Sequence, residues 1–345
     1  MNILLIRFSA FGDVAMTVPV VYSVARKYPQ HHFTVLSRET MRPLFLQMPS
    51  NVSFYGANLK QEHRGVKGIY RLFRELRSFR SFDVVADLHN VLRSQLLRTF
   101  FRLSGVGCAV IDKGKAGKRK LTRVKDKVLV QQPTSFKHYC DVLAALKLPV
   151  EIDFTSIFGN EKGDFARIVG VVGEKQPKEQ WIGVAPFAAH KGKIYPLELM
   201  EQVVATLSER PHTRLFLFGA GEQEQAVIAE WCSKYAAVSS TKGLRMETEL
   251  ILMSHLDVML SMDSANMHLA SLVNLPVVSI WGATHPYCGF MGYGQHEENV
   301  VQIAELSCRP CSVFGNRPCL RQDYACLFGI VPAIVVQRVE SVLKG

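Results

Sequence analysis

The sequence predicts an α/β protein built from two doubly wound parallel sheets, and three observations lead to this fold class. Short apolar runs alternate with stretches whose apolar residues recur at helical spacing, which is typical of parallel sheets covered by helices on both faces. The alternation starts twice, at Asn2 and again at Trp181, with a polar, loop-like stretch at 159–178 between the two series. A length of 345 residues suits two domains. We expect an N-terminal domain at 1–160 and a C-terminal domain at 161–345, both Rossmann-like and facing a central cleft.

The first series contains three predicted strands and two predicted helices. The strands are short runs rich in β-branched and other apolar residues, at 2–8, 32–37 and 83–88. A helix at 14–27 ends before Tyr28-Pro29, because a proline disfavours helical backbone in the residue before it. In a second helix at 69–82, Ile69, Leu72 and Leu76 lie on one apolar face.

The second series repeats the pattern. Strands are expected at 181–186, 213–218, 258–261 and 277–281, and helices at 197–208, 222–235 and 264–273. A last helix is expected at 330–343. Although it belongs to the C-terminal domain, it could pack back on the N-terminal domain. Ligands of such sheets bind beyond the carboxyl ends of the strands, so the residues that follow each strand are the candidates for function.

Composition narrows the class of protein. With 48% hydrophobic and 21% charged residues, the chain is typical of globular proteins and unlike disordered ones. No apolar run approaches the ~20 residues that cross a bilayer. Arg7 and Asp13 interrupt the N-terminal apolar run, which does not resemble a signal peptide. We therefore expect a cytoplasmic protein with reduced or metal-bound cysteines.

The net charge of +11 is unevenly distributed. Residues 1–150 hold 25 Lys and Arg against 9 Asp and Glu. This excess indicates an anionic partner, such as a phosphorylated lipid, a membrane surface, a nucleic acid or an acidic glycan. The alternative is a solvated basic face that serves solubility.

The first candidate site follows the first strand, at Arg7-Phe-Ser-Ala-Phe-Gly12-Asp13. Gly12 permits a tight turn, and the glycines of a dinucleotide fingerprint are absent. Asp13 at the start of the next helix is either a general base that projects into the cleft or an N-cap.

Two further candidates follow strands of the second series. Asp263 and Ser264 open a helix whose free amides and small first residues suit a diphosphate, with His268 one turn further along. Lys193 lies after the strand at 181–186 and could hold a phosphate as a point charge. Each candidate also has a purely structural interpretation. The segment from Asp263 to His268 could be a capped helix with a core histidine, and Lys193 could be a solvated loop lysine.

Taken together, these motifs resemble glycosyltransferase family 9, the ADP-heptose:lipopolysaccharide heptosyltransferases. The family's motifs R-x-S-x-x-G-D, D-x-Q-G-x-x-[KR]-S, K-x-[WY]-P, D-[ST]-[GA]-x-x-H-L-[AT] and G-x-T-x-P have counterparts here in the expected order. The first motif corresponds to Arg7, Ser9, Gly12 and Asp13, and the second loosely to Asp87, Arg93 and Ser94, with His89 and Asn90 in place of Gln-Gly. The third corresponds to Lys193, Tyr195 and Pro196. The last two correspond to Asp263, Ser264, Ala265 and His268, and to Gly282, Thr284 and Pro286.

The resemblance implies a GT-B fold and an inverting, metal-independent sugar transfer from a nucleoside-diphosphate sugar, with ADP-heptose as the expected donor and no cofactor. It implies Asp13 as general base and Lys193 as the catalytic cation that neutralises the leaving diphosphate. The implied donor-binding residues are Asp263, Ser264, Ala265, Asn266, Met267, His268 and Glu222. The chain has no D-x-D metal motif. Ala188 and Ala189 stand where active relatives usually carry hydroxyl residues, which leaves the exact donor open.

The resemblance also implies that the N-terminal domain receives a phosphorylated, lipid-linked saccharide such as a lipopolysaccharide core. The basic residues expected to bind it are Arg64, Arg93, Lys118, Arg119 and Lys120. We expect a peripheral protein on the inner face of the cytoplasmic membrane, with no nucleic-acid partner.

Three alternatives remain open in the sequence. Cys308, Cys311, Cys319 and Cys326 could hold a zinc ion or form a packed thiol cluster. A sugar-nucleotide epimerase can share the two-domain fold, and the basic half also suits a nucleic-acid-binding protein, although no recognisable nucleic-acid module is present.

Overall fold

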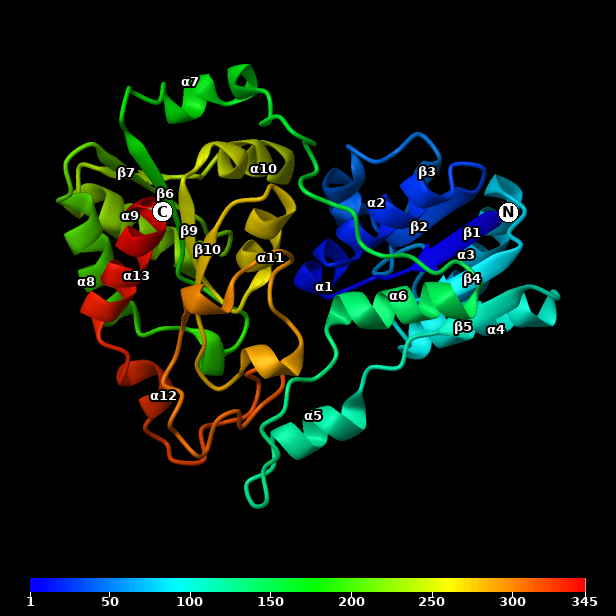
Figure 1. The fold of residues 1–345 in the computed structure, drawn as a ribbon. Coiled ribbons are helices and arrows are strands. Elements are labelled where there is room, and N and C mark those ends of the chain that lie inside the picture. The colour runs from blue at the N-terminus through cyan, green and yellow to red at the C-terminus, as the bar shows by residue number, and fades with distance from the viewer. Residues whose placement is uncertain (345) are drawn as a thin grey trace. The chain divides into compact units, whose positions relative to one another are not determined.

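The computed structural model describes residues 1–344 and divides them into two compact units (Figure 1). Unit 1 comprises Met1–Gly114 and Pro133–Ile157, and unit 2 comprises Lys115–Gln132 and the chain from Phe158 onward. The division after Ile157 falls close to the boundary expected at residue 160, but the segment Lys115–Gln132, expected in the N-terminal domain, groups with unit 2. Gly345, the last residue of the expected C-terminal domain, lies outside the described residues.

Unit 1 is built on a five-stranded parallel sheet with the order β3-β2-β1-β4-β5. Its central strand β1 is almost entirely buried, with Leu5 between Val35 and Ala86 of its neighbours. The strands are β1 Asn2–Ile6, β2 His32–Arg38, β3 Val52–Ala57, β4 Val84–Asp87 and β5 Gly107–Val110.

Helices cover both faces of this sheet. The described helices of unit 1 are α1 Phe11–Ala15, α2 Thr17–Lys27, α3 Gly65–Phe79, α4 Leu92–Leu103 and α6 Ser135–Ala145, with a 3-10 segment η1 at Glu39–Phe45. On one face α3 and α4 pack together, and Leu72 and Phe101 join a core with Leu4 of β1. On the other face α2 packs against α6.

The helix predicted at 14–27 is two helices, and it begins earlier than predicted. The break falls at Met16, between α1 and α2. Pro19 has no amide hydrogen to donate to the Ala15 carbonyl, so a continuous helix would lack that bond. The early start at Phe11 makes Asp13 the third residue of α1.

Unit 2 contains a six-stranded parallel sheet with the order β11-β10-β9-β6-β7-β8. The strands are β6 Gln180–Ala185, β7 Thr213–Leu217, β8 Val238–Ser240, β9 Val258–Met262, β10 Val277–Ile280 and β11 Val300–Val301. The predicted α/β class with two parallel sheets is therefore confirmed.

Helices α8, α9 and α13 cover one face of this sheet, and α10 and α11 lie on the other (Figure 1). The last helix, α13, packs against α8 and the sheet of unit 2. The helices of unit 2 are α5 Lys115–Leu121, α7 Val169–Val172, α8 Leu197–Ser208, α9 Glu222–Lys234, α10 Met246–His255, α11 Ala265–Leu272, α12 Ala325–Phe328 and α13 Pro332–Lys344. Short 3-10 turns are η2 Phe165–Arg167, η3 Lys191–Lys193, η4 Pro286–Cys288 and η5 Glu297–Asn299.

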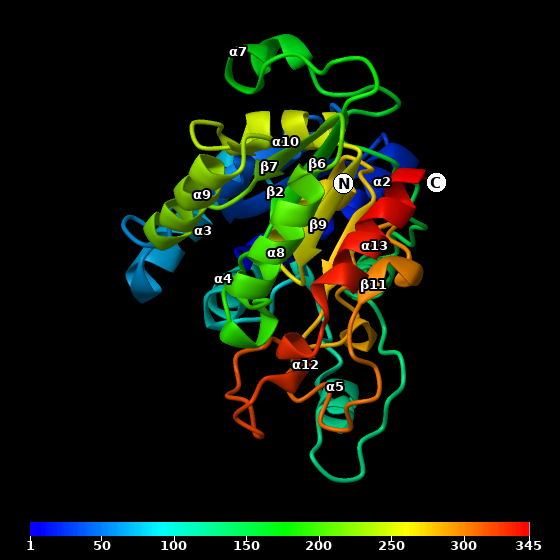
Figure 2. The ribbon, with the colours of Figure 1, turned by 90° about the vertical axis from the view of Figure 1, so that its left-hand side faces the viewer.

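The basic segment 115–132 packs within unit 2, beside the chain that follows β10 (Figure 2). Lys118 lies with its Nζ 4.3 Å from the centroid of the Phe290 ring, and Lys127 Nζ donates to the Pro310 carbonyl (3.1 Å). The Gln132 amide donates to the Tyr287 carbonyl (2.9 Å). Seven of the 25 basic residues of the first 150 therefore belong to unit 2.

Candidate active site

The turn after β1 holds Asp13 against Arg7. Arg7 follows the last residue of β1, and its Nη2 lies 2.7 Å from Asp13 Oδ2. Arg7 Nη1 donates to the Leu88 carbonyl just after β4 (2.7 Å), which fixes the guanidinium between the two strand ends. Asp13 Oδ2 also accepts the Ala10 amide (3.2 Å), so the carboxylate satisfies a donor at the start of α1 as well. One oxygen of Asp13 thus has a structural role.

The other oxygen of Asp13 is available to a ligand. Among the described residues, Oδ1 accepts no hydrogen bond, and the side chain is 25% exposed. The Tyr139 hydroxyl donates to the Asp13 carbonyl (3.2 Å), which anchors the backbone at this point. A carboxylate with one anchored and one free oxygen can accept a proton from a bound hydroxyl.

His89 lies beside this turn, in the place where the family motif has glutamine. Its Nδ1 accepts the Phe8 amide (3.4 Å), and its Nε2 lies 3.5 Å from Ser9 Oγ. Burial, reinforced by the charge of Arg7, lowers the pKa of His89 to about 3, so the imidazole is neutral at physiological pH. The Asp87 carboxylate accepts the His89 amide (3.0 Å) and stabilises the turn after β4. In the sequence, His89 is distinguished only as a departure from the motif.

In unit 2 the structure brings Lys193 and Asp263 together. Lys193 ends η3, which follows β6, and Asp263 follows β9, so two adjacent parallel strands present them at the same edge of the sheet. Lys193 Nζ lies 2.8 Å from Asp263 Oδ2, with the two side chains 15% and 3% exposed. Gly315 makes room for the lysine, because a Cβ there would lie 2.6 Å from Lys193 Cγ.

The start of α11 adds backbone donors to this pair. Ser264 is its N-cap residue, and its hydroxyl lies 3.3 Å from Ser261 Oγ instead of capping the helix. Among the described residues α11 has no side-chain cap, so the first amides, at Ala265, Asn266 and Met267, can donate to an anion. His268 is buried in the same helix.

Lys118 belongs to the surroundings of this pair, although the sequence assigned it to the acceptor. It is only 9% exposed. Burial raises the pKa of Cys288 to about 11; the charge of Asp263 raises it further, whereas Lys118 and Lys193 act to lower it. Lys118 therefore lies close enough to Cys288 to affect the same thiol as Lys193. Sequence could not show this, because the Phe290 ring that it contacts is distant in the chain.

The other predicted basic residues are exposed and distributed over both units. Arg64 is the N-cap residue of α3 and Arg93 lies in the first turn of α4, both in unit 1. Arg119 and Lys120 lie on α5 of unit 2. The residues expected to bind the acceptor therefore do not all belong to unit 1. Within residues 1–344, no helix combines the length and apolar character of a membrane span.

Glu222 is the first residue of α9 and is exposed. The Glu224 carboxylate accepts the amides of Ala220 (2.8 Å) and Gly221 (3.2 Å) and so stabilises the turn after β7. Because Glu224 performs this capping, Glu222 is left available at a strand's carboxyl end, where a nucleoside contact is expected.

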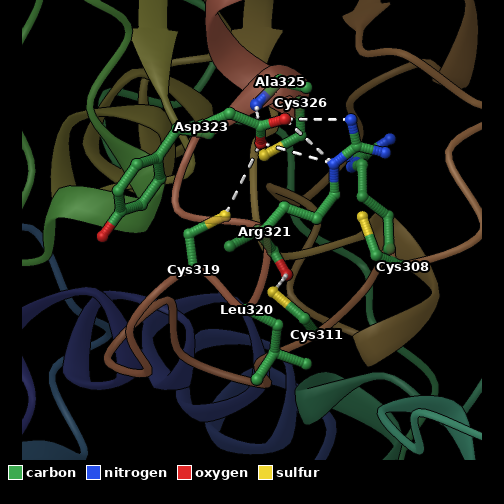
Figure 3. Close-up of a pocket in the computed structure, with 11 residues that line it drawn as sticks. Cys308, Cys311, Cys319, Leu320, Arg321, Asp323, Ala325 and Cys326 are labelled. Atoms are coloured by element: carbon green, nitrogen blue, oxygen red, sulfur yellow. Dashed lines mark hydrogen bonds and ion pairs between the residues drawn. The ribbon is translucent and has the colours of Figure 1, made fainter.

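The four C-terminal cysteines line one pocket of unit 2 (Figure 3). They are Cys308, Cys311, Cys319 and Cys326. Across the described chain, no three His, Cys, Asp or Glu side chains already converge as a set of metal ligands.

Arg309, which also lines this pocket, is a residue that the sequence analysis did not single out. It is 3% exposed, and its guanidinium donates to the carbonyls of Trp281 (3.0 Å), Gly282 (2.5 Å) and Thr284 (2.9 Å). These carbonyls belong to the loop after β10 that matches the G-x-T-x-P motif. The only sequence signal was an arginine between two cysteines.

Comparison with known proteins identifies the family. Residues 69–318 match the model of glycosyltransferase family 9 (heptosyltransferase), so the chain belongs to this family. "Lipopolysaccharide heptosyltransferase 3" of Escherichia coli is 22% identical over 281 residues, which cover 79% of this chain and 81% of that protein. "Lipooligosaccharide heptosyltransferase 2" of Haemophilus influenzae is 23% identical over 307 residues, which cover 83% and 84%.

Solved structures support the same assignment of fold. That of E. coli ADP-heptose lps heptosyltransferase II superposes with a TM-score of 0.71 at 19% identity, over 100% of this chain and 99% of the other. That of E. coli heptosyltransferase WaaC with ADP gives a TM-score of 0.68 at 17% identity, over 99% and 100%. The predicted family and GT-B fold are confirmed, and the protein is a glycosyltransferase.

Proposed function

We propose that the protein transfers a heptose from ADP-heptose to a lipopolysaccharide core or a related lipid-linked glycan, with inversion at the anomeric carbon and without a metal ion. The observation that carries this proposal is the Lys193–Asp263 pair at the uncapped start of α11. The names of the relatives, which are lipopolysaccharide and lipooligosaccharide heptosyltransferases, support the substrate class.

The leaving group departs from the donor as ADP. Breaking the bond between the anomeric carbon and the diphosphate oxygen leaves negative charge on that oxygen. Lys193 and the first amides of α11 stabilise this charge as it develops. The same charge could be neutralised by a divalent cation, so the contribution of Lys193 is open to direct test in EDTA.

The acceptor is activated by Asp13. As the acceptor hydroxyl attacks the anomeric carbon, its proton passes to the free Oδ1 of Asp13, while Arg7 holds Oδ2 in place. A single displacement of this kind inverts the anomeric configuration. His89, being neutral at physiological pH, orients the turn without adding charge beside the base.

Asp263 and Glu222 have supporting roles in donor binding. Asp263 fixes the ammonium of Lys193 and offers a second carboxylate oxygen to the hydroxyl groups of the sugar. Glu222 binds the nucleoside from the start of α9.

The acceptor is anionic and membrane-linked, and the protein acts as a peripheral protein at the inner face of the cytoplasmic membrane. The support for this is the charge of +11 and the exposed cations Arg64, Arg93, Arg119 and Lys120. Cations near an anionic surface contribute about 1 kcal/mol each.

A panel of nucleoside diphosphates tests the donor assignment. ADP should raise the thermal midpoint more than UDP, GDP or CDP, and to the same extent in EDTA and in magnesium. A preference for another base would replace ADP-heptose as the donor, and a strict need for magnesium would contradict the role given to Lys193.

A further inference from the structure

The chain that follows α5 forms a projection from unit 2. Helix α5 is the first part of segment 115–132, and the residues after it have no helix or strand. In both views this chain reaches beyond the rest of unit 2, past the end of α5 (Figure 1, Figure 2). We call residues 123–130 the projecting loop.

Contacts within unit 2 fix the base of the projecting loop. The Val128 amide donates to the Lys120 carbonyl (3.3 Å), which pairs the returning chain with α5. Lys127 Nζ donates to the Pro310 carbonyl (3.1 Å), and Lys118 Nζ lies against the Phe290 ring. These two lysines are therefore engaged at the base, whereas residues 123–126 are all exposed.

The projecting loop exposes apolar side chains to water, which is unfavourable. These residues and their exposed fractions are Val124 (76%), Val128 (44%), Leu129 (48%) and Val130 (56%). Phe314, 52% exposed, adds an aromatic ring near the base, because it packs on the Phe290 ring that Lys118 contacts (5.8 Å between ring centroids). Exposed apolar residues gathered in one place and bordered by charge mark an interaction site.

Cations surround these apolar side chains. Segment 115–132 holds seven Lys and Arg, and Asp126 is its single acidic residue. The exposed cations are Lys115, Arg119, Lys120, Arg123 and Lys125. An anionic lipid bilayer satisfies both features, since cations bind the lipid phosphates and apolar side chains enter the boundary of the acyl chains. A nucleic acid would bind the cations and leave the valines in water.

We propose that the projecting loop docks unit 2 on an anionic lipid bilayer, with Val124 and its apolar neighbours inserted at the level of the headgroups. The inference deepens the proposed function, on which it rests for a lipid-linked acceptor at the membrane. It differs from the expectation that the N-terminal domain supplies the basic surface. Because apolar side chains contribute, salt alone does not reverse the attachment.

The position of the loop suits this role. Strands β9 and β10 are parallel neighbours, and Asp263 follows β9. Segment 115–132 packs beside the chain that follows β10, through Phe290 and through the Gln132 amide, which donates to the Tyr287 carbonyl (2.9 Å). Docking by the loop therefore brings the membrane to the end of the sheet where the donor is proposed to bind.

Sedimentation of the full-length protein with lipid vesicles tests the docking. The vesicles contain phosphatidylethanolamine and phosphatidylglycerol, and vesicles of phosphatidylcholine are the neutral reference. We expect binding to the anionic vesicles that weakens as salt rises and remains detectable in high salt. The vesicles carry no saccharide acceptor, so failure to dock and failure of sugar transfer are separate results.

Two double variants separate the apolar and charged contributions. Val124→Ser with Leu129→Ser should weaken vesicle binding roughly 10- to 100-fold at low and high salt alike, at roughly 3- to 10-fold for each apolar side chain. Arg123→Ser with Lys125→Ser should weaken it roughly 30-fold at low salt only, at about fivefold for each cation. Val171→Ser is the matched control and should bind normally, because this valine is 58% exposed on α7, at the opposite end of unit 2 (Figure 2).

A fluorescent probe reports insertion without relying on a loss of binding. The three tryptophans of the chain, Trp181, Trp231 and Trp281, are buried. Val124→Trp adds an exposed indole, whose emission should shift to the blue with anionic vesicles and be quenched by bromine-labelled lipid. Val171→Trp should show neither change.

Three results would overturn the proposal. The first is equal vesicle binding by the wild type and both double variants, or no quenching in Val124→Trp. The second is binding to random-sequence DNA without binding to vesicles, which would assign the cations to a nucleic acid. The third is a dimer in solution that Val124→Ser with Leu129→Ser dissociates, which would assign the loop to a second copy of the chain.

Discussion

Removing Lys193 should have two separable consequences. The Asp263 side chain is 3% exposed and has Lys193 as its cationic partner at 2.8 Å. Lys193→Ala leaves a buried carboxylate uncompensated, which costs about 3–5 kcal/mol of stability. In a unit of about 200 residues this lowers the melting temperature by roughly 6–20 °C, at about 2–4 °C for each kcal/mol. ADP also loses a charge-assisted contact of about 1.5–3 kcal/mol, which is roughly 10- to 150-fold in affinity.

A double variant separates the two effects. Lys193→Met with Asp263→Asn removes both charges, so most of the stability should return, since replacing a buried ion pair is often close to neutral. ADP affinity should stay low. Lys162→Ala is the control, because it removes an exposed lysine of the same unit. Calorimetric titration of ADP and scanning calorimetry provide the two readouts. Normal ADP affinity in either Lys193 variant, or no loss of stability in Lys193→Ala, would refute this reasoning.

Three further predictions address the other residues. Asp13→Asn should reduce turnover about 10²- to 10⁴-fold with ADP affinity unchanged, and wild-type turnover would remove Asp13 from the mechanism. The pKa of His89 is about 3 in the folded state and about 6.5 in the unfolded state, so only the unfolded state takes up the proton as the pH falls below 6.5. Between pH 7 and pH 5 the wild type should therefore lose about 2 kcal/mol more stability than His89→Asn. Equal losses of stability in pH-dependent melts would contradict this. The double variant Arg119→Ser with Lys120→Ser should weaken binding to anionic vesicles in a salt-dependent way and leave ADP binding intact. Lys118→Met should instead weaken ADP binding. The opposite pair of results would show that the roles given to these three residues of α5 are wrong.

The fold was predictable where apolar runs are continuous. Strands β1, β6 and β9 are buried on both faces, and all three were predicted to within two residues at each end. The strands that the sequence did not reveal lie towards the sheet edges. Strand β3 is half-buried along most of its length and β11 has two residues, so neither carries a strong periodic signal.

The candidate site was predictable at the level of motifs, and its contacts were not. Lys193 and Asp263 are 70 residues apart in the chain, and only the adjacency of β6 and β9 brings them together. The basic segment 115–132 shows the limit most clearly. The sequence assigns it to acceptor binding in the N-terminal domain, with a solvated loop as the alternative, but the packing of Lys118 on Phe290 depends on a partner far along the chain. Composition describes what a segment carries and does not determine where it packs.

The stereochemistry of transfer is the most direct test of the proposed mechanism. The protein is incubated with ADP-heptose and a panel of lipopolysaccharide core acceptors in excess EDTA, and the anomeric configuration of the product is read by NMR. We expect acceptor-dependent release of ADP and a product whose configuration is opposite to that of the donor. Retained configuration, or transfer that occurs only after a divalent metal is restored, would contradict it.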